Sequence, residues 1–340
     1  MSQAERISYV LMAVFFGLTG LLHLPTLLLT ILFGYFALRL FSIRGNRFVG
    51  ISLYLVAVVA IGYGLFYFGH KTYVTLPKIA DETIPAITEY AERHKVELPF
   101  SDYTSLRKIA VDEVKDRVAN FGGYLRSTIF EFALLIIGLV VAASLHFNAR
   151  WRADDDPQVV KDSLYALVGH EMTQRFITFY RSFAKVIGAQ IAISTINTSL
   201  TAVFLLWNHF PYTTVLIALT FLCGLLPIIG NIMSNTLIVG VAFTISPKMA
   251  LISLLFLIII HKLEYFLNSK IIGDRIKNPM WMTLLAIVLG EELMGIPGMI
   301  LAPVILHYVK VETSKYKFDD RPAEPDKKPD LMESPAESGH

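Results

Sequence analysis

Long apolar stretches separated by short polar turns dominate the sequence, and their lengths predict a bundle of membrane-spanning helices. The first apolar stretch, at 7–41, is too long for one span of about 20 residues, and His23-Leu24-Pro25 divides it. We therefore expect two helices, at about 7–22 and 25–42. A third span is expected at about 48–69. The arginine-rich stretch before it contains no acidic residue, which predicts a cytoplasmic turn by the positive-inside rule.

The stretch at 70–126 breaks this pattern because it carries as many basic as acidic residues. Its apolar side chains recur every three or four residues, which predicts two amphipathic helices, at about 83–94 and 102–126. We expect this insert on the extracytoplasmic side. A fourth span is expected at 127–147. A second amphipathic stretch, at 148–185, predicts a helix along the cytoplasmic surface of the membrane.

The apolar sequence at 186–311 is expected to form the transmembrane core. It opens with a fifth span at about 186–207, and Gly and Pro then interrupt it at 224–231 and 290–298. The apolar runs beside each break are about 13 to 17 residues long, which is short for a helix that crosses about 30 Å of hydrocarbon. Paired short, broken segments are typical of transporters, in which opened helices expose backbone groups and dipole ends to a solute.

The expected fold class is all-α: a polytopic integral membrane protein of about eight transmembrane helices, with broken or re-entrant helices in its second half. The chain's last stretch is rich in Pro, Lys, Asp and Glu and is expected to be disordered in the cytoplasm. The expected parts are transmembrane helices 1 to 3 at 1–69, the insert at 70–126, transmembrane helix 4 at 127–147, the interfacial helix at 148–185, the core at 186–311 and the tail at 312–340.

Composition supports a membrane protein and narrows its partners. The chain is 54% hydrophobic and only 17% charged, and its formal net charge of +2 argues against a nucleic-acid partner. Its one cysteine, Cys223, lies in an apolar run, and we expect it to be buried. No nucleotide-binding loop, catalytic Ser/His/Asp arrangement or cysteine-based metal site is recognisable. We therefore expect no enzyme, no cofactor and no metal, and transport driven by an ion gradient.

Four polar residues form a stripe along the fifth span. Gln190, Ser194, Asn197 and Thr201 follow one another at gaps of four, three and four residues, so a helix places them on one face. Such a stripe either lines a solute path or forms hydrogen bonds to a neighbouring helix. Both interpretations are open at the level of the sequence.

The first break supplies a second group of candidates for solute binding. Pro227 has no N–H and opens the helix, and Gly230 permits a turn. Asn231 and Asn235 then lie one turn apart on the following half-helix. Its N-terminus carries partial positive charge, and opened carbonyls bind cations. The same residues also fit a tight re-entrant turn with capping asparagines.

Three carboxylates are candidates for ion coupling. Glu291 and Glu292 lie at the second break, and Glu264 ends an apolar run beside Lys262. An ionised carboxylate in hydrocarbon costs several kcal/mol unless it is paired or hydrated, so intramembrane carboxylates are often functional. At the tip of a hairpin, however, Glu291 and Glu292 would be ordinary solvated residues, and Glu264 would equally fit a local structural network.

Three groups of residues in the second half form a recognisable series. They are Pro227-Ile228-Ile229-Gly230 after an apolar helix, Lys262-Leu263-Glu264 with Asn268, Ile271, Ile272 and Gly273, and Gly290, Gly295, Gly298 and Pro303 in the last apolar segment. In these motifs the chain resembles the autoinducer-2 exporter family, also called PerM-type permeases. The resemblance implies an oligomeric, multi-span inner-membrane protein that moves small solutes. Family members have been linked to export of a quorum-sensing signal and to sodium/proton exchange. The chain departs from the family pattern at Glu291 and Glu292, where small or apolar residues are usual.

Together these features predict a permease or exporter of small solutes in the bacterial inner membrane, driven by an ion gradient. Its expected partners are a small-molecule or ion substrate, the lipid bilayer and further copies of the chain. One alternative is a Na⁺(Li⁺)/H⁺ antiporter that uses Glu291 or Glu292. A second alternative, from a different class, is a membrane scaffold that transports nothing.

Overall fold

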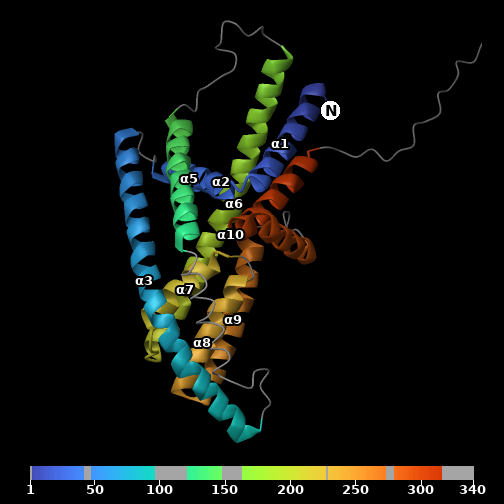
Figure 1. Cartoon of the computed structure of the whole chain (residues 1–340). Coiled ribbons are helices and arrows are strands. Elements are labelled where there is room, and N and C mark those ends of the chain that lie inside the picture. Colours follow the sequence, from blue (N-terminus) through green and yellow to red (C-terminus); the bar gives the residue numbers. More distant parts are fainter. Residues whose placement is uncertain are drawn as a thin grey trace, which may run out of the picture.

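The computed structural model describes residues 2–41, 47–95, 121–147, 163–226, 229–272 and 279–315, and its regular structure in these ranges is entirely α-helical (Figure 1). This confirms the predicted fold class. Five of the helices are long and apolar enough to cross a membrane, and three shorter ones are also apolar. The count of about eight spans stays a prediction. The helices are α1 (Gln3–Leu21), α2 (Pro25–Phe41), α3 (Arg47–His94), α5 (Phe121–Phe147), α6 (Leu164–Trp207), α7 (Thr213–Gly224), α8 (Ile229–Ile245), α9 (Pro247–Ile272) and α10 (Met280–Thr313).

Two helices are much longer than predicted. The 48 residues of α3 and the 44 of α6 extend about 72 and 66 Å at about 1.5 Å per residue, beyond the hydrocarbon thickness of about 30 Å. α3 joins the predicted third span to the predicted helix at 83–94, although it contains Pro77 and Pro85. α6 likewise joins the predicted interfacial helix to the fifth span. Most of the helix predicted at 102–126 lies outside the described residues.

The two ends of the elongated bundle carry different segments (Figure 1). The starts of α1 and α6 and the end of α10 gather at one end, and the latter two belong to segments predicted to be cytoplasmic. The end of α3 and the turns after α6 and α8 lie at the other. The two segments predicted to be cytoplasmic therefore share an end of the molecule, whereas the sidedness itself stays a prediction.

The break after α1 falls where the sequence predicts it. The N–H of Leu24 donates to the carbonyl of Thr19 (3.0 Å), and the N–H of His23 donates to that of Gly20 (3.1 Å). His23 has a φ of 53°, the left-handed conformation with which helices often end. The end of α6 repeats this arrangement with His209 at a φ of 52°, and in both places a proline follows two residues later. These two histidines therefore lie at positions where the chain ends one helix and turns into the next.

Among the described residues, two apolar cores join several helices to one another, and the polar stripe of α6 runs between them. The first core joins α1, α2, α6 and the last part of α10, and the second joins α6 to α7, α8 and α9, with a contribution from α3. Between the α6 residues of the first core and those of the second lies the segment 190–201. Central residues of the first core are Met12, Leu28, Phe179, Phe183 and Leu301, and those of the second are Leu205, Leu216, Ile238 and Leu257.

Candidate functional site

The polar stripe of α6 lies against α7, where two of its members bind the end of that helix. The amide Nε2 of Gln190 donates to the carbonyl oxygen of Gly224 (2.6 Å), and the hydroxyl of Ser194 donates to that of Phe221 (2.8 Å). Carbonyls in the last turn of a helix have no partner within it. Gln190 and Ser194 therefore stabilise the end of α7 at the break, which is the helix–helix interpretation of the stripe.

The other half of the stripe has a different environment. Asn197 is 8% exposed, and its amide oxygen is buried without a hydrogen-bond partner. The hydroxyl of its neighbour Thr198 is also buried without a partner. Thr201, one turn further along, is 1% exposed. An unpaired buried polar group costs about 1–3 kcal/mol, so this part of α6 has unused capacity to bind a polar solute.

The first break is held by a close approach of two backbones. A Cβ on Gly230 would lie 1.6 Å from the carbonyl oxygen of Cys223, so only glycine fits there. The N–H of Leu226 donates to the same carbonyl (2.8 Å), which tightens the end of α7. Pro227 lies outside the described residues, and its role stays a prediction. Cys223 itself is buried, as expected from its apolar surroundings.

A carboxylate–amide pair joins the half-helix after the break to α9. The amide nitrogen of Asn231, near the start of α8, lies 2.9 and 2.7 Å from the two carboxylate oxygens of Glu264. The side chain of Glu264 is 14% exposed, and the Nδ1 of His261 lies 3.9 Å from its Oε2. Asn235, one turn further along α8, is half-buried. Among the described residues, Glu264 is therefore the predicted ion-coupling carboxylate that contacts a predicted substrate-binding residue.

The second break folds α10 into two arms. Gly295 has a φ of 62° and a ψ of −152°, which ends one helical arm and starts the next. A Cβ on Gly298 would lie 1.8 Å from the carbonyl oxygen of Gly290, so the arms touch through these two glycines. Glu291 and Glu292 precede the turn and are exposed. Within the described part of the chain, no hydrogen bond or ion pair joins them to the Asn231–Glu264 pair.

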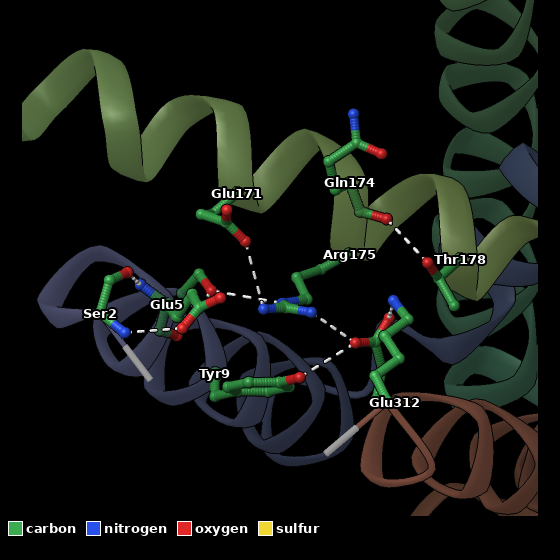
Figure 2. Close-up of polar contacts among 10 residues, drawn as sticks. Ser2, Glu5, Tyr9, Glu171, Gln174, Arg175, Thr178 and Glu312 are labelled. Atoms are coloured by element: carbon green, nitrogen blue, oxygen red, sulfur yellow. Dashed lines mark hydrogen bonds and ion pairs between the residues drawn. The ribbon is translucent and has the colours of Figure 1, made fainter. Parts of the chain in front are cut away.

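A buried ion pair that the sequence did not predict lies where α1, α6 and α10 meet. Figure 2 shows Arg175 of α6 directed at the carboxylate of Glu312 near the end of α10. Their side chains are 4% and 3% exposed. The hydroxyl of Tyr9 on α1 donates to Glu312 (3.0 Å), and the Arg175 guanidinium lies 4.0 Å from the centroid of the Tyr9 ring. Glu171 binds Arg175 at 3.2 Å, and Lys315 binds Glu312 at 2.8 Å.

One feature of the sequence points to this cluster. Arg175 lies three residues after Met172 and one before Phe176, within the apolar face of the predicted interfacial helix. A charge on such a face requires a partner when the face is buried. The sequence does not name that partner, because Glu312 is 137 residues away.

Comparison with known proteins places this architecture in a family. The model of the family described as AI-2E family transporter matches residues 7–317. A relative, "Putative transport protein YdbI" of Bacillus subtilis (strain 168), is 26% identical over 308 residues, which cover 85% of this chain and 87% of the relative. The resemblance seen in the sequence motifs is thereby confirmed. The chain is a multi-pass membrane protein and belongs to the AI-2E family of transporters.

Proposed function

We propose that the protein is a permease for small polar solutes in the bacterial inner membrane, driven by an ion gradient. The single observation that carries the proposal is the Asn231–Glu264 pair, because it connects a largely buried carboxylate to the half-helix after a break. An ion that binds at Glu264 would act directly on the broken helix. The family assignment supports transport, whereas the driving force and the solute are our own inference.

The surroundings of Glu264 support a role in ion coupling. Its carboxylate is held by amide hydrogen bonds from Asn231, and no Lys or Arg with a described side chain forms an ion pair with it. A carboxylate that is largely buried and has no cationic partner among the described Lys and Arg side chains can bind a monovalent cation. The second candidate function, a Na⁺(Li⁺)/H⁺ antiporter, would use this same carboxylate.

The solute would bind beside the ion, along α6. Ser194 fastens α6 to the end of α7, and the unpaired groups of Asn197 and Thr198 follow within one turn. A solute with hydroxyl or amide groups would satisfy them in place of water. Movement of the helix ends at the break would then be coupled to both the ion and the solute.

Homo-oligomer formation is also part of the proposal. It is supported by the family resemblance and by α3, whose apolar 18-residue stretch is only 11% buried within the chain. Lipid or a second copy of the chain would cover this surface. Cross-linking in native membranes distinguishes these two possibilities.

Flux measurements in proteoliposomes test the proposal. The purified full-length protein would be assayed with a panel of labelled small polar solutes and with ²²Na⁺, under imposed pH or Na⁺ gradients. Glu264→Gln is expected to abolish the dependence of flux on the gradient while the protein remains monodisperse. Asn197→Leu is expected to reduce solute flux and leave ion binding intact.

Glu291→Gln and Glu292→Gln are the matched controls, because each removes one carboxylate near the other break. If flux through Glu264→Gln depends on the gradient as in the wild type, and this dependence is lost in Glu291→Gln or Glu292→Gln, the coupling carboxylate lies at the second break. Coupled ²²Na⁺ and proton exchange without solute flux would identify an antiporter. Wild-type flux no greater than in protein-free liposomes would indicate a scaffold.

A further inference from the structure

A groove lies between α3, α8 and α9, at the end of the bundle that carries the turn after α8 (Figure 1). The end of α3 packs on α8 at two places. A Cβ on Gly240 would lie 2.9 Å from the methyl carbon of Thr83, and the ring centroids of Tyr90 and Phe243 lie 5.7 Å apart. The groove beside the two rings has a volume of about 440 Å³. Sites that hold small ligands have volumes of about 300–1,000 Å³, so the groove is large enough to hold part of a lipid molecule.

Apolar and aromatic side chains line most of this groove, and one lysine lies among them. The lining includes the rings of Tyr90 and Phe243 and the side chains of Leu251 and Leu254 on α9. Lys248, at the start of α9, is the charged residue among the described side chains that line the groove, and it is exposed. Apolar surface favours an apolar chain, and an ammonium group near the membrane attracts anionic head groups. The lining therefore fits a molecule that is apolar over most of its length and negatively charged at one end.

The direction of α9 indicates how such a molecule would lie. Leu251 and Leu254 follow Lys248 by three and six residues, which places them about 4.5 and 9 Å further along the helix axis. They are 58% and 46% exposed, and Leu255 and Ile258, which continue this surface, are also exposed. An exposed apolar helix surface in a membrane protein faces hydrocarbon, and a lysine near the end of a membrane helix extends toward the head groups. The groove therefore leads from the head-group level at Lys248 into the hydrocarbon along α9.

We propose that this groove binds an anionic phospholipid, with one acyl chain against Leu251, Leu254 and Phe243 and the phosphate at Lys248. The apolar lining and the lysine at one end match both parts of a phospholipid. This match favours a lipid over a second copy of the chain, for which the lysine would have no evident role.

The lipid site is separate from the proposed transport site. Glu264 follows Leu254 by ten residues, which corresponds to about 15 Å along α9. None of the residues proposed to bind the ion or the solute lines the groove. Occupancy of the groove can therefore be measured whether or not the protein transports a solute.

Native mass spectrometry of the purified full-length protein tests the site. Phosphatidylglycerol and phosphatidylcholine with identical acyl chains would be added at equal concentration, and the wild type is expected to retain phosphatidylglycerol preferentially. Lys248→Gln is expected to bind phosphatidylglycerol about five-fold more weakly, because it removes one cation at the membrane surface. The matched control Lys78→Gln removes an exposed lysine of α3 that does not line the groove, and it is expected to behave as the wild type.

The apolar part of the groove is tested separately. Leu251→Trp places a larger side chain in the groove and is expected to weaken the retention of both lipids several-fold. Leu255→Trp makes the same change one turn further along α9, outside the lining of the groove, and is expected to leave retention unchanged. Because Leu251 and Leu255 are 58% and 53% exposed, both variants are expected to fold.

Four results would overturn the proposal. The first is equal retention of the two lipids by the wild type, and the second is an unchanged preference for phosphatidylglycerol in Lys248→Gln. The third is an equal effect of Leu251→Trp and Leu255→Trp on lipid retention. The fourth is a wild-type dimer that retains no lipid and dissociates in Leu251→Trp, which would assign the groove to a second copy of the chain.

Discussion

Glu312→Gln is expected to lower the free energy of unfolding by about 3 kcal/mol, although glutamine has nearly the same shape as glutamate. The substitution removes the negative charge that faces Arg175 and leaves the guanidinium in a site where its side chain is 4% exposed. Removing one partner of a buried ion pair costs about 3–5 kcal/mol, because the remaining charge is buried without compensation.

The structure favours the lower end of this range. After the substitution, Arg175 retains Glu171 at 3.2 Å, and the side chain of Glu171 is 27% exposed. The Glu171 carboxylate offsets part of the lost stabilisation of Arg175, but because Glu171 is partly hydrated this offset is small. Tyr9 also keeps an acceptor, because the glutamine side chain still presents a carbonyl oxygen. The remaining cost is that of one incompletely paired guanidinium.

Unfolding of the purified protein in mixed micelles, titrated with a denaturing detergent and followed by tryptophan fluorescence, measures this difference. The matched control is Arg93→Gln, which breaks an ion pair with Glu89 whose side chains are 72% and 66% exposed. It is expected to cost a few tenths of a kcal/mol. The pair of substitutions Arg175→Met and Glu312→Leu is expected to restore stability to near the wild-type value, because no buried charge is then orphaned.

Equal losses in Glu312→Gln and Arg93→Gln would refute this reasoning, because burial would then make no difference to the two ion pairs. A double replacement as unstable as Glu312→Gln would show that the loss arises from packing and not from the orphaned charge. Either outcome would also show that the Arg175–Glu312 ion pair does not fix the packing of α10 on α6 and α1.

Two further predictions concern the helix breaks. Gly298→Ala is expected to destabilise the protein by about 1–3 kcal/mol or more through overpacking, because the new Cβ would lie 1.8 Å from a carbonyl oxygen of the opposing arm. Gly64→Ala, where nothing lies within 4 Å, is expected to be neutral or to stabilise by up to about 1 kcal/mol, and the same titration compares the two. Ser194→Ala removes the hydrogen bond to α7 and is expected to cost about 0.6 kcal/mol. Ser199→Ala removes only a bond within α6 and is expected to cost less; equal effects would contradict the assigned role of Ser194.

Much of the architecture could be predicted from local sequence signals. Hydropathy identified the membrane-protein class, and His23 with the following proline marked the turn between α1 and α2. Glycines at 230, 295 and 298 marked both later breaks. These signals are local because one residue's missing N–H, missing Cβ or apolar side chain changes the conformation of its own turn. Length was less predictable: α3 continues through two prolines, since losing single backbone hydrogen bonds need not end a helix.

The candidate site depended on contacts between distant parts of the chain. Periodicity placed the stripe of α6 on one face, but only the fold showed that Gln190 and Ser194 bind the end of α7 while the amide oxygen of Asn197 remains unpaired. The sequence alone determined that this chain forms membrane helices and that it turns after α1 and breaks at the two glycine-containing segments, because burial in lipid and backbone geometry act residue by residue. Only the tertiary structure decided which carboxylate meets Asn231 and which meets Arg175. A buried charge or amide is stabilised by whichever partner the packing of distant helices brings within hydrogen-bond distance.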